Sequence, residues 1–139
     1  MKISELFLHV ILPVILGASI YLLFRTTDLL MFHWLRSLGF WSQVLSIREI
    51  VSQIHLSNWI LYSLPDGIWV YSSTYLMMMI WRKDLSFTSR IWISAPVTCA
   101  IVTEILQVTR TISGSFDFLD LEFNVLAFQL SLIIGDSKC

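Results

Sequence analysis

Four strongly polar residues stand where the sequence otherwise predicts apolar helices inside a membrane: Glu104, Gln107, Asp120 and Asn124. The first two lie near the end of one apolar run, and the last two lie at the start of the next. Ionisable groups at membrane depth are costly, and they usually face the interior of a helix bundle or a water-filled cavity. These residues therefore predict a polar site between helices.

The spacing of the four residues places them on two facing surfaces. Glu104 and Gln107 are three positions apart on one helix, and Asp120 and Asn124 are four apart on the next, so each pair shares a face. The Ser-Gly-Ser segment 113–115 is a natural tight turn that makes the two helices antiparallel neighbours. Each helix then brings one carboxylate to a common space. Facing carboxylates repel unless one is protonated or a cation bridges them.

This pattern supports several kinds of chemistry. In an enzyme, Glu104 is the general acid or base and Asp120 its partner. In a binding protein, the head group of a ligand contacts a wider set of polar residues, which are Asp66, Gln107, Asp117 and Asn124. The plainer alternative is that the polar residues form hydrogen bonds between helices, with Asp117 and Asp120 as helix caps.

Metal and cofactor chemistry find little support in the sequence. An oxygen-only ligand set suits a hard divalent ion, but we predict no metal site and no cofactor. The three histidines, His9, His33 and His55, do not converge by any spacing argument. The sequence contains no hydrolase triad pattern, zinc-protease helix or phosphate loop.

The composition predicts an integral membrane protein. Of the 139 residues, 56% are hydrophobic and only 14% are charged, which is too little charge to cover a soluble domain of this length. We expect one all-α membrane domain covering residues 1–139. The net charge of −1 gives no basic surface for nucleic acid.

Four apolar runs have about the 20 residues that a bilayer requires: 6–24, 64–81, 90–109 and 121–134. The last is short, so it must either borrow residues from Phe118 backwards or sit in a locally thinned bilayer. Ser63 before Pro65 and Asp66 predicts a capped helix start for the second run. The connection 25–62 predicts two amphipathic helices lying in the membrane interface, and a re-entrant hairpin is the alternative.

The distribution of basic residues predicts the orientation. Arg82, Lys83 and Arg90 surround the short connection between the second and third runs, which favours a cytoplasmic location for that connection. With four spans, both termini are then cytoplasmic. The polar residues, including Asp66 and Asp117, fall in the outer leaflet, and they share one leaflet whichever way the protein inserts.

These motifs resemble those of the VanZ-like family of small bacterial membrane proteins. The resemblance rests on E-x-x-Q at 104–107, D-x-x-x-N at 120–124, the turn residues 115–117 and Asp66 at the head of the second run. It covers the C-terminal half of the chain. The chain departs from the family pattern at three positions, where it carries Gly67, Val70 and Ala127. The turn arginine is also missing, although Arg110 could replace it from the other side of the turn.

The resemblance implies a multi-pass protein of the bacterial inner membrane and a link to antibiotic (glycopeptide) resistance. It suggests a protein that binds an envelope lipid or a cell-wall glycolipid. Two alternatives remain: a membrane enzyme acting on a lipid or lipid-linked sugar, and a self-assembling structural or pore-forming subunit. The expected partners are a membrane lipid or glycolipid, further copies of the chain or another membrane protein, and no nucleic acid.

Overall fold

The computed structural model describes residues 3–27, 30–81, 84, 86–112 and 116–136, and within these ranges it contains helices and no strand. The elements in chain order are α1 (Ile3–Leu6), η1 (Phe7–Ile11), α2 (Leu12–Phe24), α3 (Leu30–Ser37), α4 (Trp41–Val51), α5 (Asn58–Leu61), α6 (Ser63–Ile80), α7 (Phe87–Val108) and α8 (Phe118–Asp136). The expected all-α fold class is therefore confirmed.

Three helices are long and apolar enough to cross a membrane. They are the continuous helix Ile3–Phe24, formed by α1, η1 and α2, together with α7 and α8. α8 begins at Phe118, so the short fourth run borrows residues back to that position, the first of its two alternatives. α6 is not one of the three, because Asp66 and several hydroxyl side chains dilute its apolar character. The four-span topology therefore stays a prediction.

The first span contains a local irregularity with a clear cause. η1 is a π-helical turn that ends two residues before Pro13. Proline has no N–H to donate to the carbonyl group four residues earlier, which here belongs to His9. A single π-turn is a common way for a helix to absorb such a local mismatch.

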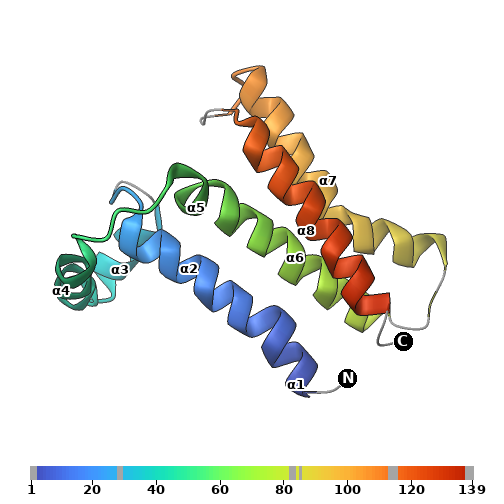
Figure 1. Cartoon of the computed structure of the whole chain (residues 1–139), viewed down its shortest axis with the longest axis horizontal. Helices are drawn as coiled ribbons and strands as arrows, with labels where there is room; N and C mark the ends of the chain where they lie inside the picture. The colour runs from blue at the N-terminus through green and yellow to red at the C-terminus, as the bar shows by residue number, and fades with distance from the viewer. Residues whose placement is uncertain (1–2, 28–29, 82–83, 85, 113–115, 137–139) are drawn as a thin grey trace.

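α6 is the central helix, and it packs against α2, α7 and α8. Figure 1 shows it running between α2 and α8. Gly67 permits the close approach of α8, because a Cβ atom there would lie 3.2 Å from the backbone oxygen of Phe123. Small residues at such points let helices in membranes approach closely.

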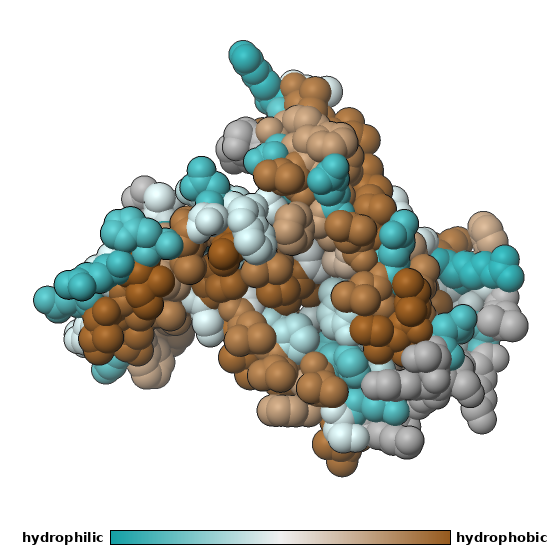
Figure 2. Space-filling view, in the orientation of Figure 1, coloured by the Kyte–Doolittle hydropathy of each residue, from teal (hydrophilic) through white to brown (hydrophobic). Residues whose placement is uncertain are grey.

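Burial in this bundle is the reverse of that in a soluble protein. Large apolar side chains face outward, and Ile133 and Leu126 are 68% and 61% exposed. Small hydroxyl side chains are buried between the helices: Ser63, Ser72, Thr74, Ser89 and Ser131. Figure 2 shows apolar side chains along the visible faces of α2 and α8. This arrangement is the one expected when lipid is the solvent.

The connection after α2 contains the two predicted short helices, α3 and α4. Phe32 of α3 is fully buried and meets the edge of the Trp41 ring, with the ring centroids 5.9 Å apart. The Arg48 guanidinium of α4 donates to the Leu22 carbonyl oxygen at 2.8 Å and to the Arg25 carbonyl oxygen at 2.9 Å. It thereby caps the end of the first span. The position of α3 and α4 in the membrane interface stays a prediction.

One expectation about a helix start was wrong. α6 begins at Ser63 itself, with Tyr62 at the N-cap and no side-chain cap hydrogen bond. Ser63 is instead buried, and the described residues offer its hydroxyl no partner. Arg82, Lys83 and the turn 113–115, which entered the predictions of orientation and pairing, lie outside the described residues.

Candidate functional site

α7 and α8 form the two long walls of the candidate site. Pro96 lies inside α7, and Figure 1 shows the helix bending in its middle, as an internal proline would cause. The C-terminal half of α7 then packs against α8. α7 ends in a tight turn in which Thr111 N–H donates to the Leu106 carbonyl at 2.9 Å. Arg110 adopts the left-handed conformation there, with φ of 56°.

Asp117 starts α8. Its Oδ1 accepts from the Leu119 backbone N–H at 2.9 Å, and its carbonyl accepts from the Asp120 N–H at 3.1 Å. Asp117 therefore caps the start of α8, as the plainer alternative expected, and its role in binding stays a prediction. Asp120 is different, because it is only 8% exposed, its Oδ1 has no partner among the described residues, and it lines a hollow described below.

Two hollows lie where α6, α7 and α8 meet, and they share Asp66, Glu104 and Gln107. The first, here called the charged hollow, has a volume of about 460 Å³ and is lined by Tyr21, Arg25, Asn58, Tyr62, Asp66, Glu104, Gln107, Asp117 and Asp120. The second, here called the slot, has a volume of about 340 Å³ and is lined by Asp66, Trp69, Val70, Ser73, Pro96, Cys99, Ala100, Thr103, Glu104, Gln107 and Asn124.

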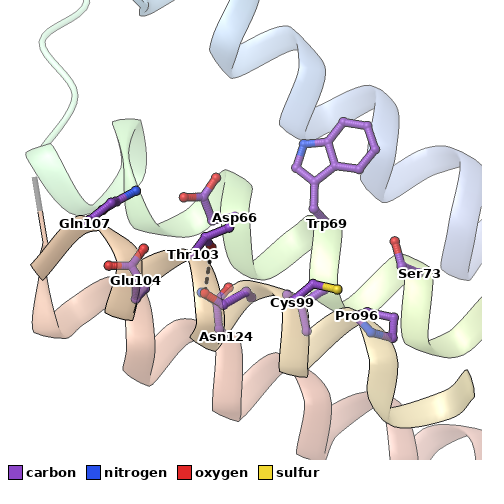
Figure 3. A pocket seen from close by; sticks show the side chains of 11 residues that line it. Asp66, Trp69, Ser73, Pro96, Cys99, Thr103, Glu104, Gln107 and Asn124 are labelled. Carbon is purple, nitrogen blue, oxygen red and sulfur yellow. Dashed lines mark hydrogen bonds between the residues drawn. The ribbon is translucent and has the colours of Figure 1, made fainter. Parts of the chain in front are cut away.

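The polarity of the side chains that line the slot changes along its length. Figure 3 shows Asp66, Glu104 and Gln107 toward one end. Trp69, Cys99, Pro96 and Ser73 lie toward the other end. Trp69 is 46% exposed and Cys99 is also exposed, so the apolar end opens on the outside of the helices. Because the two hollows share Asp66, Glu104 and Gln107, they adjoin, and together they are here called the passage, with a charged end and a less polar end.

Arg25 supplies a positive charge to the charged hollow. Its guanidinium lies over the rings of Tyr21 and Tyr62, 4.5 and 4.4 Å from their centroids. It donates to the Tyr21 hydroxyl oxygen at 2.8 Å, and that hydroxyl donates to Asp66 Oδ1 at 3.2 Å. These two hydrogen bonds, which link Arg25 to Tyr21 and Tyr21 to Asp66, thus fix one wall of the hollow.

The opposite wall is acidic. Glu104 is 5% exposed and interacts electrostatically with Asp120, Asp66 and Asp117. Among the residues that line the two hollows, the donor Arg25 Nε and four buried acceptor oxygens have no hydrogen-bond partner in the described part of the chain. The four oxygens are Glu104 Oε2, Gln107 Oε1, Asp120 Oδ1 and Asn124 Oδ1. Buried polar atoms are normally satisfied, so each of these four requires an explanation.

The structure brings together all six residues that the sequence singled out. Asp66, Glu104 and Gln107 line both hollows, Asn124 lines the slot, and Asp117 and Asp120 line the charged hollow.

Sequence reasoning missed four other residues of the charged hollow: Tyr21, Arg25, Asn58 and Tyr62. A usable signal existed for two of them, because Tyr21 and Arg25 are four positions apart at the end of an apolar run.

Other expected contributors lie elsewhere. Arg110, which was considered as a replacement for the family's turn arginine, is exposed and lines neither hollow. His9 accepts from or donates to the Tyr71 hydroxyl at 2.7 Å and stacks on Tyr75, away from both hollows. Within the described part of the chain, no group of His, Cys, Asp and Glu residues could hold a metal ion.

Comparison of the chain with protein-family models, with characterised proteins and with solved structures finds no match.

Proposed function

We propose that this protein is a VanZ-like membrane protein that binds an amphiphilic lipid of the bacterial envelope. The polar head group of the lipid occupies the charged hollow, and one of its chains lies in the slot. A cell-wall glycolipid and a membrane lipid both fit this description.

The observation that carries the proposal is the change of character along the passage. Its charged end contains Asp66, Glu104 and Asp120, whereas its other end is formed mainly by apolar side chains beside the exposed Trp69, with the Ser73 hydroxyl among them. An amphiphile has the same division between a polar and an apolar part. Ligand pockets typically combine apolar walls with a few convergent polar groups, as here.

The proposal includes a topology. α6 has 18 residues, which span about 27 Å at 1.5 Å per residue and nearly match a hydrocarbon core of about 30 Å. Its hydroxyl residues Ser63, Ser72 and Thr74 are buried where α6 packs against the other helices. This burial lowers the free-energy cost of placing α6 across the membrane as a fourth span. Both termini are then cytoplasmic, the charged hollow lies in the outer leaflet, and α3 and α4 lie in the interface beside it.

Native mass spectrometry tests the proposal. The purified protein is incubated with a bacterial polar lipid extract, and the bound lipids are weighed for wild type and for Glu104→Gln. The matched control is Glu122→Gln, because Glu122 lies on α8 but is exposed and lines neither hollow. We expect the wild type and the control to retain the same lipid and Glu104→Gln to lose it. Equal retention by all three proteins would contradict the proposal.

A second candidate, an enzyme acting on a lipid or lipid-linked sugar, is favoured by one observation. Several carboxyl groups interact around the buried Glu104, which is the arrangement used when one carboxyl gives a proton and another stays ionised. Glu104 is then the general acid or base and Asp120 its partner. The two candidates are separated by analysing the retained lipid after incubation, since an enzyme changes its mass and a binding protein does not.

A further inference from the structure

We infer that the head group bound in the charged hollow is rich in hydrogen-bond donors, either the N–H groups of an ammonium or the O–H groups of a sugar. This inference rests on the proposed lipid binding and names the class of ligand for that site.

The first observation is the chemistry of the four unsatisfied oxygens. All four are hydrogen-bond acceptors, and three of their residues are almost fully buried: Glu104, Asp120 and Asn124 are 5%, 8% and 2% exposed. The residues that the structure describes provide no donor for any of these oxygens. Leaving buried acceptors without donors is costly, most of all for charged groups.

The two carboxylates carry this argument on their own. An amide such as Asn124 can turn over and exchange its oxygen for its NH₂ group. A carboxylate has two oxygens, so Glu104 and Asp120 present acceptors whichever way they turn. Protonation of one of the two carboxyl groups would supply a single donor and leave other oxygens unsatisfied, so the complementary group is one that brings donors.

The second observation is the balance of charge in the hollow. Four carboxyl groups line it, those of Asp66, Glu104, Asp117 and Asp120. The Arg25 guanidinium donates to Tyr21 through Nη2 and lies over two aromatic rings. Its Nε is a single buried donor without a partner among the described residues, so the unmet acceptors of the hollows outnumber this one unmet donor. A bare phosphate would add negative charge beside Glu104 and Asp120 and would bring no donor. An ammonium or a set of hydroxyl groups satisfies the acceptors without that repulsion.

The test compares four lipids, of which the first two differ only in hydrogen-bond donors. Phosphatidylethanolamine has three N–H groups where phosphatidylcholine has three N-methyl groups, and both keep the positive charge and the phosphate. Monoglucosyl diacylglycerol supplies hydroxyl donors without charge, and phosphatidic acid supplies phosphate alone. The affinity of the full-length protein for each lipid, with identical acyl chains, is measured by native mass spectrometry.

We expect phosphatidylethanolamine or the glucosyl lipid to bind at least tenfold more tightly than phosphatidylcholine and phosphatidic acid. Whichever of the two donor lipids binds more tightly identifies the donor as an ammonium or as sugar hydroxyls. Gln107→Met provides a second variant. It keeps the size of the side chain and removes one unsatisfied acceptor, so we expect normal folding and a smaller preference for the donor lipid.

Two results would overturn the inference, and they are distinguishable. If all four lipids bind equally and Glu104→Gln weakens them all, lipid binding stands and the donor requirement is wrong. If Glu104→Gln changes the binding of none of the lipids, the proposed function fails as well.

Discussion

Replacement of Arg48 by methionine tests how the connection 25–62 controls the site. Arg48 donates two charge-assisted hydrogen bonds to carbonyl groups at the end of the first span, those of Leu22 and Arg25. These carbonyls have no partner within their own helix, and the negative end of the helix dipole favours a cation there. Methionine keeps most of the side-chain volume and removes both donors.

The expected loss of stability follows from these contacts. Hydrogen bonds to charged groups contribute about 1.5–3 kcal/mol each when buried, and the two bonds of Arg48 are only partly buried. We therefore expect a loss of about 2–3 kcal/mol in the free energy of unfolding. We also expect weaker lipid binding, because the backbone that Arg48 holds is that of Arg25, whose side chain lines the charged hollow.

Arg36→Met is the matched control. Arg36 is exposed and lies over the Trp41 ring at 4.4 Å, an exposed cation–π contact that contributes about 0.5–1 kcal/mol. Reversible unfolding in mixed micelles gives the two free energies, and native mass spectrometry gives the lipid affinities. The reasoning is refuted if Arg48→Met is no less stable than Arg36→Met. Loss of stability with unchanged lipid affinity would show that the two Arg48 hydrogen bonds do not influence the charged hollow.

Three further predictions concern packing, strain and topology. Gly67→Ala should destabilise the protein by about 1–3 kcal/mol, because its Cβ would meet the Phe123 backbone oxygen at 3.2 Å. Gly135→Ala meets only the flexible end of Met78 and should cost less; equal losses would contradict the packing argument. Arg110→Gly should stabilise the protein by about 1 kcal/mol by relieving a left-handed backbone, whereas Arg110→Ala should not; a gain with alanine would assign the effect to the side chain. Reporter fusions after Ser57 and after Asp84 should lie on opposite sides of the membrane if α6 crosses it, with Asp84 inside, and fusions on the same side would leave three spans.

The sequence predicted the walls of the site because those walls depend on short-range spacing. Glu104 and Gln107 share a face of α7 by helical geometry alone, and the short connection to α8 leaves Asp120 and Asn124 few places other than opposite them. Polar residues in apolar runs are also few, which makes them conspicuous.

The rest of the site depends on contacts between distant segments. Tyr21 and Arg25 reach Asp66 only because α2 packs against α6, and Tyr62 reaches Arg25 only because α5 folds over the end of α2. No periodicity in one sequence reports such pairings. The start of α6 was misplaced for a related reason, since the Ser63 hydroxyl is buried by tertiary packing and makes no cap bond.

The location of a bound lipid chain tests the central claim most directly. Diacyl lipids that carry a diazirine in one chain, with either an ethanolamine or a glucosyl head group, are incorporated with the protein in nanodiscs and illuminated, and the labelled residues are mapped by peptide mass spectrometry. The account predicts that labels concentrate on the slot, at Trp69, Cys99 and Ala100, and that Glu104→Gln reduces this labelling while Glu122→Gln does not. Labels distributed evenly over the lipid-facing side chains, such as Leu126 and Ile133, with no effect of Glu104→Gln, would contradict it.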